Sequence, residues 1–252
     1  MSHGNTVRAA DGTRAPALTF MDNVRDQLAA PLFTANLKST IPGTYSFGFI
    51  NETEHVGGDI FYTPVDDASI YWTFTVAGYR HVFPANGTEV GSAEDDGGVE
   101  KRQESSPPPP VVQEYPFAAI ADTGTTLALL PDSVVADYWL RVPGSRYDES
   151  WAAIVFPCAA SLPDWEFYVD GEAEGPGDHG GGAQQQQQQY RGVVPGRYMN
   201  YGRINSTFCY GGLQSSDGIG FSVFGGTVLK AQFVVFDLGG MRLGWAGKEL
   251  ET

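Results

Sequence analysis

Apolar residues in this chain fall into short runs that alternate with turn-forming residues. Runs such as TYSFGFI, GDIFYTPV and YWTFTV follow one another between Thr34 and Val76, separated by stretches rich in Gly, Pro and Asp. Two later runs, AAIVFPC and DWEFYV, have the same length and character. Runs of about four to eight such residues bounded by turn residues are typical of strands. The pattern predicts an all-β fold, with an antiparallel sheet over residues 34–76.

Two segments depart from the strand pattern and predict helices. From Thr19 to Phe33 apolar residues recur at helical spacing, with Asp22 near the start and Pro31 near the stop, which predicts one amphipathic helix. In the later stretch PDSVVADYWLRV, Asp132 is placed to cap a second helix. The apolar positions of the two helices are Met21, Val24, Leu28 and Leu32, and Val134, Val135, Tyr138 and Trp139.

Two polar segments of low complexity interrupt the predicted strands. Residues 84–114 mix Gly, Ser and charged residues with four consecutive prolines, and residues 171–191 contain six consecutive glutamines. Neither segment can bury enough apolar area to order itself, so both are predicted to be exposed insertions. Beyond them the chain closes on FVVFDLGGMRLGWA, which predicts a hairpin with its turn at residues 237–240.

Composition supports a large β domain and narrows the possible partners. The 252 residues, 42% of them apolar, are enough to bury a sizeable core, and 32 Gly and 16 Pro favour short strands joined by turns. Thirty acidic residues against 15 basic ones give a net charge of −15, which disfavours nucleic acid and anionic membranes as partners. No apolar run approaches the ~20 residues of a membrane span. The amino-terminal stretch MSHGNTVRAADGTRAPALTF also lacks the apolar core of a signal peptide.

The two cysteines, Cys158 and Cys209, have neither the number nor the spacing for a zinc site. If they are paired, they close a loop of roughly 50 residues, for which the chain-entropy model gives about 4 kcal/mol of stabilisation. Two free buried thiols are the alternative at this point.

Other residues with chemical potential give weaker patterns. Three sequences of the form Asn-X-Ser/Thr, at Asn51, Asn86 and Asn205, fit the pattern for N-glycosylation. The histidines lie in separate loop-like segments with no Ser or Cys nucleophile pattern near them. All four are therefore expected at the surface, and they are His3, His55, His81 and His179.

The stretch FAAIADTGTTLALL places one carboxylate, Asp122, at a tight turn between two apolar segments. An isolated Asp-Thr-Gly is most simply a turn in which the carboxylate bonds to nearby amides. Here the tripeptide has apolar flanks on both sides, and hydroxyl residues stand in and directly after it at Thr123, Thr125 and Thr126. An apolar-apolar-Gly sequence, Val223-Phe224-Gly225, follows about 100 residues later.

This combination resembles the carboxy-terminal lobe of a pepsin-like (family A1) aspartic protease of the fungal penicillopepsin and endothiapepsin type. The resemblance extends from Thr19 to about Ala246 and implies an all-β lobe with a few short helices and an inter-lobe sheet. It assigns residues 19–33 to a helix at the end of the amino-terminal lobe and residues 34–252 to the carboxy-terminal lobe, and it leaves residues 1–18 outside the family. It also implies a disulfide between Cys158 and Cys209 and a secreted or vacuolar location.

The resemblance implies an acid-active endopeptidase that cuts polypeptide substrates without a metal or organic cofactor. Two aspartates about 3 Å apart share one proton in such enzymes, so that one activates water while the other protonates the scissile carbonyl. Asp122 is then the carboxy-lobe member of the pair. Supporting roles fall on the residues around it: Thr123 in a hydroxyl lattice, Gly124 for close backbone approach, Thr125 bonding the outer carboxylate oxygen, and Val223, Phe224 and Gly225 packing beneath the loop.

A second catalytic aspartate is not found in the sequence. Asp11 stands in a polar segment with the letters out of order, Asp217 lies in a Ser-rich turn, and Asp237 lacks the following hydroxyl residue. The amino-terminal lobe, with its own Asp-Thr-Gly and flap, would lie before Thr19. A further departure from the fungal pattern is Gly226, where those proteases usually carry Asp.

Four interpretations therefore remain open at the level of sequence. The chain is one lobe of an endopeptidase whose amino-terminal lobe is missing from it, for example through a shortened gene model. Alternatively, two copies form a homodimer in which each supplies one Asp122, or the chain is a catalytically inactive module that binds peptides or proteins. The fourth interpretation is an unrelated β-sandwich.

Overall fold

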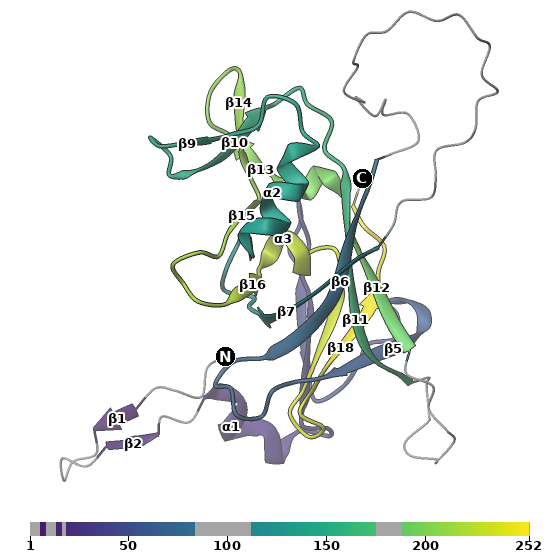
Figure 1. Cartoon of the computed structure of the whole chain (residues 1–252). Helices are drawn as coiled ribbons and strands as arrows, with labels where there is room; N and C mark the ends of the chain where they lie inside the picture. Colours follow the sequence, from purple (N-terminus) through teal and green to yellow (C-terminus); the bar gives the residue numbers. More distant parts are fainter. Residues whose placement is uncertain (1–5, 9–13, 17–18, 84–111, 175–187, 252) are drawn as a thin grey trace, which may run out of the picture.

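The computed structural model describes residues 6–8, 14–16, 19–83, 112–174 and 188–251. The described part is built mainly of strands, which confirms the predicted all-β fold (Figure 1). The first nine strands are β1 (Thr6–Arg8), β2 (Arg14–Pro16), β3 (Leu32–Asn36), β4 (Thr44–Phe47), β5 (Val56–Pro64), β6 (Thr73–Val82), β7 (Gln113–Ala121), β8 (Ala128–Leu130) and β9 (Arg146–Asp148). The other nine are β10 (Ala153–Pro157), β11 (Asp164–Glu174), β12 (Gln188–Val194), β13 (Asn200–Arg203), β14 (Phe208–Gly211), β15 (Leu213–Ser215), β16 (Ser222–Phe224), β17 (Phe233–Asp237) and β18 (Arg242–Gly247).

The helices are short and few within these ranges. They are α1 (Phe20–Val24), α2 (Asp132–Leu140), α3 (Gly226–Leu229) and two 3-10 turns, η1 (Arg25–Gln27) and η2 (Gly196–Met199). None of the described helices is long and apolar enough to cross a membrane.

One large mixed sheet of 12 strands organises the molecule. Its strand order is β15-β8-β16-β7-β6-β11-β5-β18-β17-β3-β4, and β12 pairs with β11 off this path. Most neighbours are antiparallel, as predicted for the region of β3 to β6, but β16 runs parallel to β7 and β15 runs parallel to β8. A separate four-stranded sheet, β13-β14-β10-β9, lies at the top of the molecule in Figure 1.

An aromatic core fills the space beneath β16. The Phe224 ring lies 5.0 Å from that of Phe167 and 5.7 Å from that of Trp165, while Phe74 and Trp245 pack 5.1 Å apart at the same place. All five side chains are buried. Truncation of such a residue to alanine typically costs about 3–5 kcal/mol, so this cluster holds the strands around β16 in fixed positions.

The first predicted helix is wrong in its extent. A capping box between Thr19 and Asp22 starts α1, but the α-helix ends at Val24, the 3-10 turn ends at Gln27, and β3 begins at Leu32. The reason is long-range pairing: Phe33 is registered opposite Phe236 of β17, and the two rings stack with centroids 4.5 Å apart. Strand pairing and ring stacking therefore outweigh the helical spacing of the apolar residues.

The second predicted helix is confirmed as α2, with its four apolar residues buried. The predicted cap is wrong, however. Pro131 occupies the N-cap position, and the carboxylate of Asp132 instead accepts a hydrogen bond from the hydroxyl of Ser215. The amides of Val134 and Val135 donate to the carbonyl of Pro131 at 2.9 and 3.1 Å, and the aspartate joins α2 to β15.

The predicted insertions are shorter than the sequence indicated. β7 already begins at Gln113, β11 continues to Glu174, and the last two glutamines of the tract start β12. These polar residues pair with neighbouring strands: Gln188 is opposite Gly171, and Glu172 is opposite Tyr62. Polar composition alone therefore did not exclude them from the sheet. The remaining parts, residues 84–111 and 175–187, lie outside the described residues.

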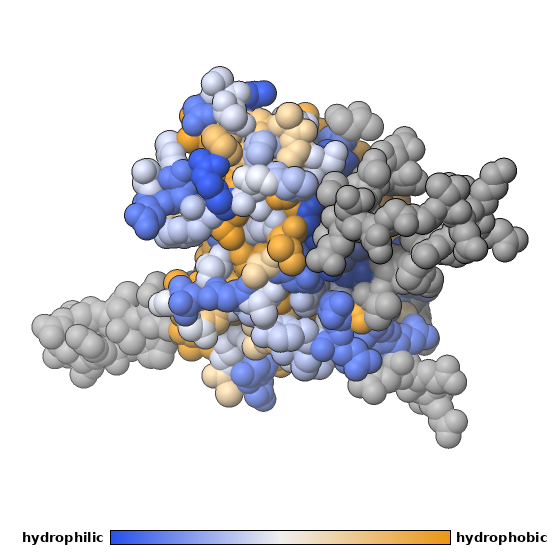
Figure 2. All heavy atoms as spheres, turned by 45° about the horizontal axis from the view of Figure 1, so that its top comes forward, coloured by the Kyte–Doolittle hydropathy of each residue, from blue (hydrophilic) through white to orange (hydrophobic). Residues whose placement is uncertain are grey.

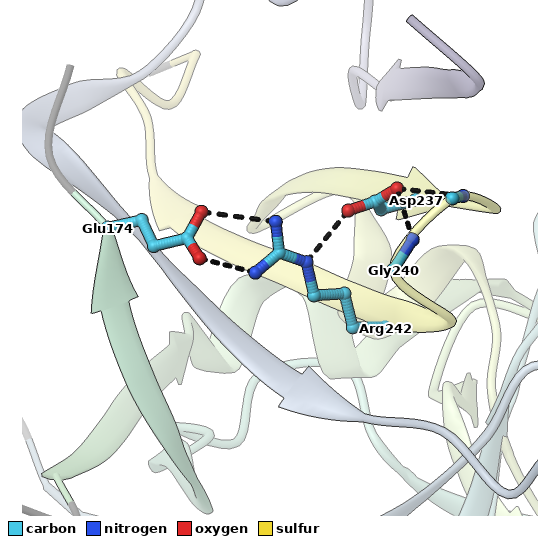
Figure 3. A network of polar contacts seen from close by, with 5 residues as sticks. Glu174, Asp237, Gly240 and Arg242 are labelled. Carbon is cyan, nitrogen blue, oxygen red and sulfur yellow. Dashed lines mark hydrogen bonds and ion pairs between the residues drawn. The ribbon is translucent and has the colours of Figure 1, made fainter. Parts of the chain in front are cut away.

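The predicted hairpin of β17 and β18 is confirmed and is tied to β11 by a polar network (Figure 3). Asp237 accepts hydrogen bonds from the amides of Gly239 and Gly240 at 3.0 and 2.9 Å and from Nε of Arg242 at 2.7 Å. The guanidinium group of Arg242 also pairs with both carboxylate oxygens of Glu174 and stacks over the Tyr62 ring at 3.9 Å. Asp237 therefore closes the turn between β17 and β18, and it holds Arg242, which links β18 to β11.

Cys158 and Cys209 form a disulfide, with an S–S distance of 2.01 Å. The bond joins the end of β10 to β14, which are already paired with Phe156 opposite Cys209. This confirms the pairing implied by the family resemblance and excludes the alternative of two free thiols.

The prediction that the histidines lie at the surface is wrong for His55 and His81, which are buried; His3 and His179 lie outside the described residues. His81 projects from β6 between the rings of Tyr79 and Tyr138, at centroid distances of 5.3 and 5.5 Å. Its Nε2 lies 2.9 Å from a carboxylate oxygen of Asp137, which also pairs with Arg141. Burial lowers the pKa of His81 to about 4, although the neighbouring Asp137 opposes this effect.

Replacing His81 with Phe is expected to remove a specific acid sensitivity of the fold. The imidazole is neutral in the folded protein, whereas the unfolded chain takes up its proton near pH 6.5, so stability is lost as the pH falls from about 6.5 to about 4. Over this window wild type should lose about 3 kcal/mol more than the variant in its free energy of unfolding. Urea titrations at each pH measure the difference. If the difference in free energy of unfolding between wild type and the variant did not change with pH, the lowered pKa of His81 would be contradicted.

Candidate active site

Strand β16 positions the turn that carries Asp122. It lies between β7 and β8, parallel to β7 with Phe224 opposite Ala121 and antiparallel to β8 with Phe224 opposite Ala128. The chain leaves β7 at Ala121, turns over the end of β16 and returns as β8. The backbone amide of Asp122 donates to the carbonyl of Phe224 at 3.1 Å, so the carboxylate lies where β7 and β16 end and β8 begins.

The carboxylate of Asp122 is held at both oxygens. Oδ1 accepts a hydrogen bond from the amide of Gly124 at 2.9 Å, and Oδ2 accepts one from the hydroxyl of Thr125 at 2.7 Å. The residue is half-buried, so it is partly accessible to solvent. Donors at fixed positions orient a carboxylate. The turn therefore presents a preorganised acidic group.

The neighbouring residues Thr123 and Gly124 are exposed. Within the described residues the hydroxyl of Thr123 makes no hydrogen bond, so its predicted place in a hydroxyl lattice requires a partner from outside them and stays a prediction. A side chain at Gly124 would bring its Cβ to 3.2 Å from Oδ1 of Asp122, which is tight. Glycine at this position thus avoids a steric contact with the Asp122 carboxylate.

The residues Val223, Phe224 and Gly225 are buried directly beneath the turn. A Cβ built on Gly225 would lie 2.2 Å from the carbonyl oxygen of Leu127 and 2.5 Å from that of Thr125. Real Cβ atoms do not approach backbone oxygens so closely. Only glycine therefore allows the strand to pass this close to the turn.

The residues that follow β16 also fix the turn, and one of them, Thr227, was not singled out from the sequence. The amide of Gly226 donates to the carbonyl of Thr125 at 2.7 Å, and Thr227 donates to the carbonyl of Thr126 through both its amide, at 2.8 Å, and its hydroxyl, at 3.1 Å. Gly226, which replaces the expected Asp, contributes through its backbone alone. Thr227 supplies the side-chain bond, and its position two residues after Gly225 was the available clue.

Gly225→Ala is expected to destabilise the fold by about 3 kcal/mol, because the new methyl group forces apart the turn and the start of α3. Gly226→Ala is the matched control. Its Cβ would have no atom nearer than 3.4 Å, an ordinary contact, so it should cost less than about 1 kcal/mol. Urea unfolding of both variants measures the two effects. If Gly225→Ala were as stable as Gly226→Ala, the turn would be able to accommodate the methyl group, and the close contact would not require glycine.

A cleft of about 410 Å³ lies further along β7 and β16, and the residues that line it include Ala118, Phe221 and Asp217. Phe221 packs against Tyr71 with ring centroids 5.5 Å apart, and both rings are about 40% exposed. Figure 2 shows apolar side chains across the middle of the visible face, with hydrophilic residues above and below them.

The other aspartates considered as catalytic partners have different roles. Asp237 belongs to the network around Arg242, Asp217 accepts a bond from the amide of Gly218 at 3.1 Å, and Asp11 lies outside the described residues. Among the described residues, no group of three or more His, Cys, Asp and Glu side chains is arranged to hold a metal ion.

Comparison with known proteins identifies the family. A family profile described as eukaryotic aspartyl protease matches residues 5–248 and so includes part of the segment 1–18, which the resemblance did not cover. Penicillopepsin-1 of Talaromyces stipitatus is 40% identical over 233 residues, covering 92% of this chain and 48% of the relative. Aspergillopepsin-1 of Aspergillus fumigatus is 39% identical, with the same coverage.

A solved structure shows the same fold. The aspartic proteinase from Irpex lacteus superposes with a TM-score of 0.62 at 21% identity, covering 96% of this chain and 64% of that one. The chain spans about half the length of the curated relatives it matches. From the extent of the family match and the identity to these relatives, the chain belongs to the eukaryotic aspartyl protease family.

Proposed function

We propose that this chain forms the carboxy-terminal lobe of an aspartic endopeptidase and that Asp122 is one of its two catalytic carboxylates. The observation that carries the proposal is the geometry of the turn. The Asp122 carboxylate is held by Gly124 and Thr125 where β7 and β16 end and β8 begins, and the residue is half-buried. Membership of the protease family supplies the chemistry that such a group performs.

In this mechanism Asp122 shares one proton with a second carboxylate. Two carboxylates at about 3 Å cannot both be ionised, so one serves as base towards water and the other as acid towards the carbonyl of a peptide bond. The hydroxyl of Thr125 and the amide of Gly124 keep the Asp122 oxygens in place as their charge changes. Fixed donors of this kind lower the reorganisation that the reaction requires.

The second carboxylate comes from outside these 252 residues. The sequence contains one Asp-Thr-Gly, and the relatives are about twice as long as the matched region. The exposed rings of Tyr71 and Phe221 are available to contact a complementary lobe or a polypeptide substrate. So is the hydroxyl of Thr123, which has no hydrogen-bond partner within the described ranges. The partner is an amino-terminal lobe, and a second copy of this chain is the alternative that the experiment distinguishes.

The proposal is tested by assaying cleavage of an acid-denatured protein at about pH 4, between the two pKa values known for such a dyad. The chain is assayed alone and after coexpression with the unmatched portion of the Talaromyces stipitatus penicillopepsin-1. Activity in the pair only, lost with Asp122→Asn, is the expected result. If the chain alone is active and its activity rises with the square of its concentration, the second carboxylate comes from a second copy of the chain. No Asp122-dependent cleavage in either sample would overturn the endopeptidase function and favour a binding module.

The location that fits this function is the secretory route, ending outside the cell or in the vacuole. The disulfide supports it, because such bonds persist in oxidising compartments. The fungal pepsin-like relatives point in the same direction. Detection of the chain in the culture medium or the vacuole fraction tests this; recovery from the cytosol alone would contradict it.

A further inference from the structure

The turn between β13 and β14 carries one of the three Asn-X-Ser/Thr sequences, Asn205-Ser206-Thr207. The amides of Ile204 and Asn205 both donate to the carbonyl of Phe208, at 2.9 and 3.2 Å, so the backbone of the turn is closed by hydrogen bonds. This hairpin forms the top of the molecule in Figure 1, well separated from the end of β7 where Asp122 lies. The turn is therefore a fixed and protruding feature.

The two ends of the Asn205 side-chain amide are used differently. Oδ1 accepts hydrogen bonds from the backbone amides of Thr207 and Phe208, both at 2.8 Å. Nδ2 makes no hydrogen bond with any described residue, and the side chain is exposed. The oxygen thus orients the group, and the nitrogen faces solvent. Nitrogen is the atom that is modified in N-glycosylation.

The hairpin is also bound to the disulfide. The amide of Cys158 donates to the carbonyl of Thr207 at 2.9 Å, and Cys209 follows two residues later. A disulfide at this place indicates that the hairpin matures in an oxidising compartment. The enzymes that add N-linked sugars act in the same secretory route, on acceptor sequences that end up at the surface.

We propose that Asn205 carries an N-linked glycan. In the reaction, Nδ2 of Asn205 loses one proton and bonds to the anomeric carbon of an oligosaccharide, while the pyrophosphate-linked lipid that carried the sugar leaves. The hydroxyl of Thr207 is exposed and completes the acceptor sequence. The proposal rests on the proposed passage through the secretory route and is independent of protease activity.

The other two sequences fit less well. At Asn51 the same oxygen, Oδ1, accepts both the amide of Thr53, at 3.2 Å, and its hydroxyl, at 2.9 Å, so the threonine hydroxyl of the acceptor sequence is already engaged. The Asn51 side chain is also only half-exposed. Asn86 lies outside the described residues. Asn205 is therefore the site that the described structure favours.

The test uses the full chain produced in a fungal host behind a secretion leader. Secreted protein is treated with peptide N-glycosidase in heavy-oxygen water, and tryptic peptides are examined by mass spectrometry for conversion of Asn205 to labelled Asp. Two variants remove the site without disturbing the turn. Asn205→Asp keeps an oxygen for the Thr207 and Phe208 amides but has no Nδ2, and Thr207→Ala keeps Asn205 but removes the hydroxyl.

The expected result is loss of one oligosaccharide mass increment in each variant and retention of the increment in Thr207→Ser. The state of Cys158 and Cys209 in the same sample shows which compartment the protein reached. Disulfide-bonded protein with an unmodified Asn205 would overturn the proposal, and so would modification confined to Asn51 or Asn86. Neither result bears on catalysis, so failure here is distinguishable from failure of the proposed protease function.

Discussion

Asp122→Asn is expected to lower kcat of the assembled protease by about 10²–10⁴-fold, the range typical of a lost general acid-base group. The amide cannot share a proton with the second carboxylate or ionise to activate water. Asparagine keeps an oxygen for the amide of Gly124, and the Thr125 hydroxyl can rotate to accept from the new NH₂ group. The turn should therefore persist, with KM and the unfolding midpoint close to those of wild type.

The measurement is steady-state kinetics on a peptide substrate, together with urea unfolding of both proteins. Asp66→Asn is a matched control, because Asp66 also accepts a turn amide, that of Ala68 at 3.0 Å, but is exposed and lies in the turn before β6. It should leave kcat unchanged. If Asp122→Asn retained more than about a tenth of the wild-type kcat, Asp122 would not be a member of the catalytic pair.

Replacing both cysteines with alanine is expected to lower the free energy of unfolding by about 4 kcal/mol. The disulfide joins residues 51 positions apart, and without it the unfolded chain regains the conformational freedom of that loop. Since the total stability of a domain is commonly 5–15 kcal/mol, on the order of a third of it depends on this bond. The small sheet that holds β10 and β14 should be the first to loosen.

Urea titrations of the double variant and of wild type measure this effect. The comparison is repeated in the presence of a thiol reductant, where the two proteins should unfold at nearly the same urea concentration. A double variant as stable as oxidised wild type would show that strand pairing alone holds the sheet. A gap that persists in reductant would point to packing at the buried Cys209 instead.

The turn at Asp122 shows which parts of the site a local sequence pattern can predict. Its apolar flanks and the Val223-Phe224-Gly225 sequence are enough to predict one carboxylate between buried strands. Only the structure shows that β16 passes between β7 and β8. The contribution of Thr227 was not predicted, because it depends on which carbonyl lies opposite its hydroxyl after the chain has folded, about 100 residues further along.

The sequence by itself determined the properties that depend on neighbouring residues: the strand-rich class, the existence of α2, the final hairpin and the acidic turn. The tertiary structure alone decided the early end of α1, the burial of His81 and the continuation of strands into polar segments. Phe33 lies in a strand because Phe236 is opposite it, and His81 is buried because α2 covers β6. These outcomes depend on pairings between distant parts of the chain, whose free energy exceeds the local preferences of about 1 kcal/mol or less per residue.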